Sequence, residues 1–118
     1  MVGGYDTPST PSAQTAAVEQ WNGSSWTEVN DLNTAGYAMG TAGTTPSALV
    51  FCGANRAGKT EDWNGNNWAE TSDNPVSRDG LSGVGTTSNA LAIAGPATGA
   101  TVEEWSSTSN TTKTISTD

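Results

Sequence analysis

No histidine occurs among the 118 residues, and cysteine occurs only once. The absence of histidine excludes Ser-His-Asp and Cys-His catalysis, histidine-based zinc sites and the commonest general base. The single cysteine excludes a disulfide within the chain. Cys52 ends the apolar run 49–52, so we expect a small buried hydrophobe there rather than a reactive nucleophile.

Basic residues are also scarce, with four lysines and arginines against 12 aspartates and glutamates, for a net charge of -8. Phosphate contacts and anionic membranes both require clustered basic side chains, so we expect neither nucleic acid nor a membrane as a partner. The sequence has no apolar run of about 18 residues, and no charged segment followed by an apolar one. Neither a transmembrane segment nor a signal peptide is therefore expected.

Large aliphatic residues are few, since Leu, Ile, Val and Phe total 14 of the 118 residues. With the net charge, this falls in the range of disordered chains. The tryptophans indicate the opposite, because Trp21, Trp63 and Trp105 recur with a constant period of 42, each with a glutamate two positions before it. We call this spacing the sequence period. A fixed period of this size is typical of stacked structural repeats, so we expect an ordered repeat protein.

The sequence period divides the whole chain. Residues 35–76 and 77–118 align without gaps as two complete units of equal length, in which Glu61 matches Glu103. Residues 1–34 form a partial unit in which Glu19 takes the position of Glu61. We expect strands B, C and D in this partial unit, and strands A to D in each complete one.

Turn residues place the strands within a unit. Asn64-Gly65 separates two strand-like segments, which is a strong hairpin signal because both residues tolerate positive φ. The turn leaves Trp63 and Trp68 opposite each other, as an aromatic cross-strand pair. In the unit 35–76, the expected strands are A near 37–44, B at 48–53, C at 59–64 and D at 67–72.

Four short strands in a period of about 40–50 residues are typical of a β-propeller blade. The chain resembles kelch-type blades, which end their second strand in a glycine pair, as in Val2-Gly3-Gly4. They carry Glu-x-aromatic on the third strand, as in Glu19-Gln20-Trp21, and a tryptophan on the fourth, as in Trp26. Segment 60–70 is also similar to repeat proteins of bacteriophage and environmental viral sequences. The copper site of kelch-type oxidases needs histidine, so no cofactor is expected from this resemblance.

The resemblance therefore implies an all-β protein with four-stranded antiparallel propeller blades. A closed ring needs at least about four blades, and this chain supplies two and a three-stranded part. We expect the ring to be completed by homo-oligomerisation, with a dimer of about six blades favoured. The alternative is that the chain is a piece of a longer repeat array.

The repeated residues are predicted to be structural. Tryptophans at fixed places fill the space between blades, and repeated glutamates accept hydrogen bonds from the backbone. Adjacent carboxylates such as Glu61 and Asp62 point to opposite faces of a strand, so they do not converge on a substrate. No catalytic residue and no metal ligand is expected. The predicted structural set is Trp21, Trp26, Trp63, Trp68, Trp105, Glu19, Glu61 and Glu103.

A ligand is better sought in the loops, where binding residues concentrate on a rigid scaffold. In a propeller the B–C and D–A connections share one face, although they can equally be solvated turns. The candidate ligand residues of this loop face are Tyr5, Asp6, Asn55, Arg56, Lys59, Arg78 and Asp79.

The sequence thus predicts a non-catalytic structural or binding module. The viral resemblance implies a component of a phage-like virion or an adhesion protein. The alternative is a glycan-binding lectin with a shallow site on each blade, because tryptophans can stack on sugars. The expected partner is a second copy of the chain, and a further protein or a glycan is the other possibility.

Overall fold

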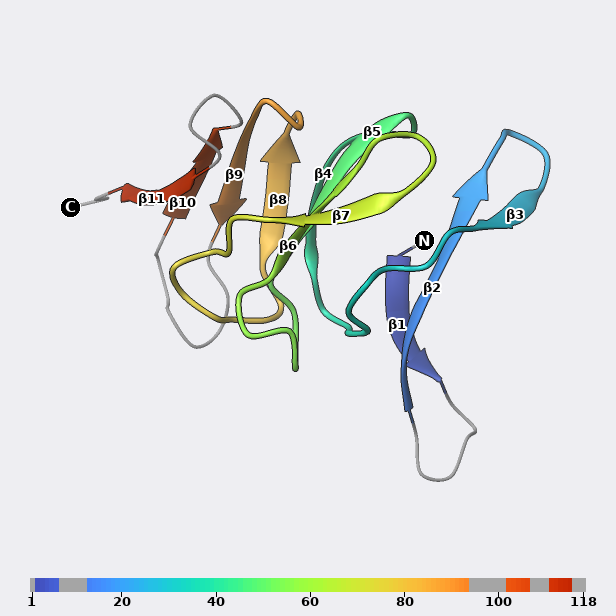
Figure 1. Cartoon of the computed structure of the whole chain (residues 1–118), viewed down its shortest axis with the longest axis horizontal. Helices are drawn as coiled ribbons and strands as arrows, with labels where there is room; N and C mark the ends of the chain where they lie inside the picture. Colours follow the sequence, from blue (N-terminus) through green and yellow to red (C-terminus); the bar gives the residue numbers. More distant parts are fainter. Residues whose placement is uncertain (1, 7–12, 94–101, 107–110, 116–118) are drawn as a thin grey trace.

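The computed structural model describes residues 2–6, 13–93, 102–106 and 111–115, in which every regular element is an antiparallel β-strand. The strands form three sheets that follow one another across the molecule (Figure 1). No helix that could cross a membrane is found in these residues. The first sheet contains β1 (Val2–Asp6), β2 (Ala13–Trp21) and β3 (Trp26–Val29); the second contains β4 (Gly40–Thr44), β5 (Ser47–Phe51), β6 (Thr60–Trp63) and β7 (Trp68–Thr71); the third contains β8 (Ser82–Gly85), β9 (Asn89–Ile93), β10 (Val102–Ser106) and β11 (Thr111–Ile115).

Within each sheet the strands lie in chain order, each paired with the next along the sequence. The four strands predicted in residues 35–76 are all present, with ends that differ by at most three residues. The largest difference is at the start of β4. Ala38 has a positive φ of 55° and Tyr37 forms an isolated bridge to Ala54, so the chain bends before the strand begins.

Asn-Gly turns connect β2 to β3 and β6 to β7. In the second turn Gly65 has a φ of 98°, and the side-chain oxygen of Asn64 accepts hydrogen bonds from the amides of Asn66 and Asn67 at 2.9 Å. The turn places Trp63 directly opposite Trp68, with ring centroids 5.1 Å apart. Trp21 and Trp26 form the matching pair in the first sheet, at 5.4 Å.

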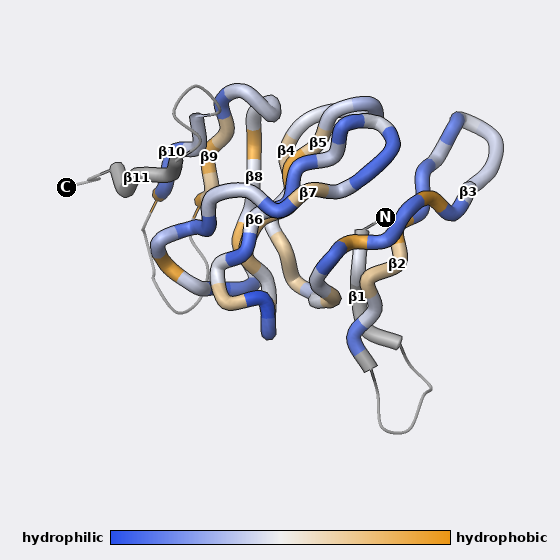
Figure 2. The backbone as a smooth tube through the Cα atoms, viewed as in Figure 1, coloured by the Kyte–Doolittle hydropathy of each residue, from blue (hydrophilic) through white to orange (hydrophobic). Residues whose placement is uncertain are grey.

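Strand β5 is buried on both of its faces. Because side chains alternate along a strand, Leu49 and Phe51 point toward the third sheet and Val50 points toward the first. The hydrophobic segments accordingly gather in the inner strands, and the connecting loops are mostly hydrophilic (Figure 2). The second sheet is therefore packed between the other two. The first seam, between the first and second sheets, buries Val18, Leu32, Val50, Trp63 and Trp68; the second seam, between the second and third, buries Leu49, Phe51, Cys52, Leu81, Ala90, Ala92 and Trp105.

Glycine allows the innermost strands of neighbouring sheets to approach each other. A Cβ atom at Gly83 of β8 would collide with the carbonyl oxygen of Thr41 in β4 and with the ring of Phe51. A Cβ at Gly40 would collide with the same ring. These positions therefore require glycine for close packing rather than for an unusual backbone angle.

Candidate functional site

The five tryptophans fall into two environments. Trp63, Trp68 and Trp105 are 5, 8 and 5% exposed, whereas Trp21 and Trp26 are 47 and 55% exposed. The prediction that Trp21 and Trp26 are core residues is therefore wrong for the chain by itself. Their exposure has a simple cause, because no described sheet lies against the side of the first sheet from which they project.

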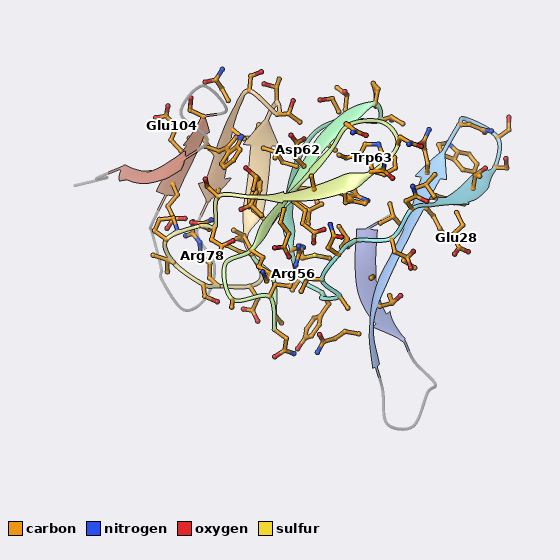
Figure 3. The ribbon with its side chains drawn as sticks, viewed as in Figure 1. Glu28, Arg56, Asp62, Trp63, Arg78 and Glu104 are labelled. Carbon is orange, nitrogen blue, oxygen red and sulfur yellow. The ribbon has the colours of Figure 1, made fainter. Side chains whose placement is uncertain are left out.

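The register of the first sheet defines this open surface. Val18 pairs with Val29, and both pack into the first seam. Glu19 pairs with Glu28 and Trp21 pairs with Trp26, so alternation along the strands places these four on the opposite side. Figure 3 shows Glu28 on β3, at the end of the molecule opposite Glu104. We call this surface the indole face; its residues are Glu19, Trp21, Trp26 and Glu28.

A second open surface lies at the far end of the row of sheets, on the third sheet. Val84 is 55% exposed, and Leu91 and Ile93 are partly exposed. A shallow hollow of about 290 Å³ lies over Val84 and Leu91, beside Glu104. Glu104 projects from β10 on the side away from the second sheet (Figure 3). We call this surface the aliphatic face; its residues are Val84, Leu91, Ile93 and Glu104.

A cleft of about 380 Å³ lies between the first and second sheets. The indole nitrogen of Trp63 donates to the carbonyl of Thr45 at 3.1 Å, whereas the indole nitrogen of Trp68 is buried and donates to no described atom. The residues that border the cleft are Val18, Glu19, Gln20, Trp21, Trp26, Val29, Thr44, Thr45, Ala48, Trp63 and Trp68. Glu19, Trp21 and Trp26 also belong to the indole face, so this part of the β2–β3 hairpin borders both the cleft and that face.

A buried ion pair lies beside the first seam. The guanidinium of Arg56 binds the carboxylate of Glu61, and both side chains are fully buried. Glu61 also accepts hydrogen bonds from the backbone amide of Asn33 at 2.7 Å, from its side-chain amide at 3.0 Å and from the amide of Thr34 at 3.3 Å. Glu61 therefore ties the second sheet to the segment that follows the first sheet. Burial lowers the pKa of the Arg56 guanidinium, and Glu61 opposes that change.

A second buried ion pair lies beside the second seam. Arg78 contacts Glu103 at 3.3 Å and donates to the carbonyl of Ala92 at 3.2 Å. Neither carboxylate oxygen of Glu103 accepts a well-formed hydrogen bond from a described atom. Burial raises the pKa of the Glu103 carboxyl above its usual value, and the charge of Arg78 opposes that rise. This pair is therefore held less completely than the pair of Arg56 and Glu61.

The two arginines reach matching glutamates from different places in the sequence. Arg56 lies in the β5–β6 connection of the second sheet, and Arg78 lies in the segment between the second and third sheets. Gly36 stands one sequence period before Arg78, and a Cβ atom at Gly36 would lie 2.6 Å from the Cγ and Cδ of Arg56. In the first seam Arg56 therefore fills the space beside Gly36, whereas in the second seam the arginine stands at the sequence position that matches Gly36.

These contacts correct two of the predicted loop ligands. Arg56 and Arg78 are 1 and 4% exposed, because each neutralises a buried glutamate instead of facing solvent. Asn55 is exposed and Asp79 is partly buried. Lys59 is partly exposed and pairs with Glu70 at 3.1 Å. Tyr5 and Asp6 lie at the end of β1, where their backbones pair with Gln14 and Ala13.

A signal for the arginine pairs does exist in the sequence. A repeated glutamate that is predicted to be buried needs a positive partner, and the chain has only four basic residues. Pairing the repeated glutamates with these few cations would have made Arg56 and Arg78 two of four candidates, with Lys59 and Lys113 as the others. Arg56 and Arg78 lie in predicted loops between strands, and this position instead predicts that their side chains are exposed to solvent.

Cys52 lies in an environment that disfavours a reactive thiol. Cys52 is fully buried, its thiol lies 3.6 Å from the carbonyl oxygen of Val76, and burial raises its pKa. A thiol in such a site is inert, because the thiolate is the nucleophile. Among the residues that the structure describes, no group of three or more Cys, Asp or Glu side chains is placed to hold a metal ion.

Comparison with known proteins gives a match of fold. Neither the family models nor the curated proteins match this sequence. Among solved structures, the chain is similar to one described as a novel fungal alcohol oxidase of the AA5 family in complex with copper. The TM-score is 0.59 and the sequence identity is 19%, over 78% of this chain and 21% of that one. The chain thus spans about a fifth of the oxidase, and the likeness shows an all-β fold alone; the copper and the oxidation belong to that protein.

Proposed function

We propose that the three sheets are blades of a kelch-like β-propeller, which acts as a non-catalytic structural or binding module and whose ring is completed by a second copy. The observation that carries this proposal is the contrast between buried and open indoles. Trp63 and Trp105 are covered by a neighbouring sheet, and Trp21, one sequence period before Trp63, is open to solvent. A further sheet on the indole face would bury it in the same way.

Equivalent contacts that lie one sequence period apart support the interpretation as blades. Ala48 lies opposite Trp63 and Ala90 lies opposite Trp105. The indole of Trp63 donates to the carbonyl of Thr45 at 3.1 Å, and that of Trp105 donates to Thr87 at 3.0 Å. One unit of sequence thus produces one pattern of pairing and hydrogen bonding in each four-stranded sheet.

The size of the open surface fits association. Two half-exposed indoles amount to roughly 200 Å² of apolar surface, which is worth about 5 kcal/mol when it is removed from water. Losing the freedom of two separate chains costs at least a similar amount. In a closed dimer the freedom of the two chains is lost once, whereas apolar surface is buried at two seams. The closed ring is therefore favoured over a dimer with a single contact.

The biological setting proposed for the module is a phage-like virion or an adhesion protein. This part rests on the resemblance of segment 60–70 to viral repeat proteins alone. The absence of histidine from the sequence supports a non-catalytic role, because the commonest general base is missing.

The solution mass of the 118-residue chain tests the proposal. We expect light scattering to give twice the chain mass of 12.0 kDa at micromolar concentration. Association should strengthen as salt rises, because each copy carries a net charge of -8 and the Debye length falls from about 30 Å at 0.01 M to about 8 Å at 0.15 M. A mass of one chain at all salt and protein concentrations, up to millimolar, would contradict self-assembly.

Glycan binding is a second candidate, favoured by the exposed pair of Trp21 and Trp26 beside the 380 Å³ cleft. Indole rings stack on the apolar faces of sugars. A glycan array probed with the chain tests this candidate. A positive glycan whose binding is lost in Trp26→Ala would support it, and silence across the array would remove it.

A further inference from the structure

We infer that the indole face of one copy docks on the aliphatic face of a second copy, in a head-to-tail contact that repeats the second seam. This inference rests on the proposed function and adds to it which surfaces meet. The two faces lie at opposite ends of the row of sheets: Figure 3 shows Glu28 at one end and Glu104 at the other. Two copies therefore can meet at both ends and close a ring.

The second seam shows which residues cover an indole of this type. Trp105 packs in one cluster with Leu49 and Phe51, and Ala42 packs against that cluster. One sequence period after these three residues stand Leu91, Ile93 and Val84. These are the apolar residues of the aliphatic face, and Val84 is the most exposed of them at 55%. The aliphatic face of the third sheet thus matches the surface of the second sheet that covers Trp105. No described residue packs on the aliphatic face in the way that Trp105 packs on the second sheet.

The carboxylates of the two faces are compatible with this contact. Asp62 stands one sequence period before Glu104 and is partly buried, and burial raises the pKa of its carboxyl. An acidic side chain is therefore already accommodated at this position of a packed sheet. Glu28 stands one sequence period before Glu70, which stays exposed at the rim of the first seam and pairs with Lys59. Glu28 and Glu104 therefore weaken the association of two copies through charge repulsion, but their side chains do not prevent the two faces from packing together.

The internal seams also decide between head-to-tail and face-to-face pairing. In both of them the buried indoles pack against aliphatic side chains of a different sheet. A contact of unlike surfaces is heterologous, so each copy uses both faces, and a rotation that closes after two copies gives two identical seams. Face-to-face pairing would use one face twice and leave the other open.

Two complementary variants test the inference. The head variant carries Trp21→Glu and Trp26→Glu, and the tail variant carries Val84→Glu and Leu91→Glu. All four substitutions add charge to surfaces that are open in the single chain. A matched control carries Ser24→Glu and Ser88→Glu, two exposed turn positions outside both faces. Circular dichroism and the urea midpoint establish that each variant is folded before association is measured.

Sedimentation equilibrium then separates the outcomes. We expect the control to associate like the parent chain and each face variant to sediment as one chain. An equimolar mixture of the two variants should associate at least about tenfold more tightly than either variant alone, because it retains one seam with both natural faces. A mixture that associates no more tightly than its components overturns the inference.

The remaining outcomes identify what fails. A tail variant that associates like the parent chain, while the head variant does not, means that indole faces pair with each other; self-assembly then stands and head-to-tail docking falls. A parent chain that stays at the mass of one chain removes the proposed self-assembly itself. Face variants that both associate like the parent place the contact elsewhere on the molecule and overturn the inference.

Discussion

Trp63→Ala is expected to unfold the protein or bring it close to unfolding. The Trp63 side chain is 5% exposed, packs in the first seam against Val18 and Val50, and donates to Thr45. Truncating a buried tryptophan costs about 3–5 kcal/mol. Whole domains are stable by only about 5–15 kcal/mol, so the loss takes a large part of the total. Urea unfolding followed by far-ultraviolet circular dichroism measures it.

Trp21→Ala is the matched control, since Trp21 occupies the same register position in the first sheet and is 47% exposed. At concentrations where the chain is a monomer, we expect it to lower the free energy of unfolding by less than about 1 kcal/mol. Equal losses for the two variants would mean that burial between sheets is not what gives the indoles their structural role.

Glu61→Gln is expected to have an effect of similar size. The substitution removes the negative charge that neutralises Arg56 and weakens the hydrogen bonds from Asn33 and Thr34. A buried charge left without its partner costs about 3–5 kcal/mol. The urea midpoint should therefore fall strongly, and the first sheet should loosen from the second, because the bonds lost connect the two.

Glu70→Gln is the control for this change, because Glu70 lies directly opposite Glu61 across β6 and β7 and its side chain is 46% exposed. Its ion pair with Lys59 is screened by water, so we expect a much smaller loss than for Glu61→Gln. Comparable losses in Glu61→Gln and Glu70→Gln would contradict a special role for the buried pair.

Local signals in the sequence predicted the strands well. Asn64-Gly65 predicted the hairpin of β6 and β7, although only Gly65 takes a positive φ; Asn64 stabilises the turn through its side-chain oxygen instead. The unbroken apolar run of β5 indicated a strand buried on both faces, and Leu49 and Val50 do enter different clusters. These predictions succeeded because each depends on a few neighbouring residues.

Features that depend on distant parts of the chain could not be predicted in the same way. Trp21 and Trp63 have the same neighbours in sequence, and only the presence or absence of a packed sheet separates their exposures. Arg56 and Arg78 were assigned to a solvent-facing loop, because sequence alone does not show that a loop side chain turns inward toward a buried carboxylate. Solvation of such a charge is decided by tertiary packing.

The two ways of supplying an arginine restrict how gene segments of this chain can recombine. One seam combines Gly36 with Arg56; one sequence period after these two residues, the sequence has Arg78 and Thr98. A crossover between these positions has two products. One combines both arginines, which collide because Gly36 no longer leaves space for the Arg56 side chain. The other has neither arginine and leaves the glutamate carboxylate buried without a cation. An exchange of segments therefore preserves one arginine for each buried glutamate only when its breakpoint falls outside this interval.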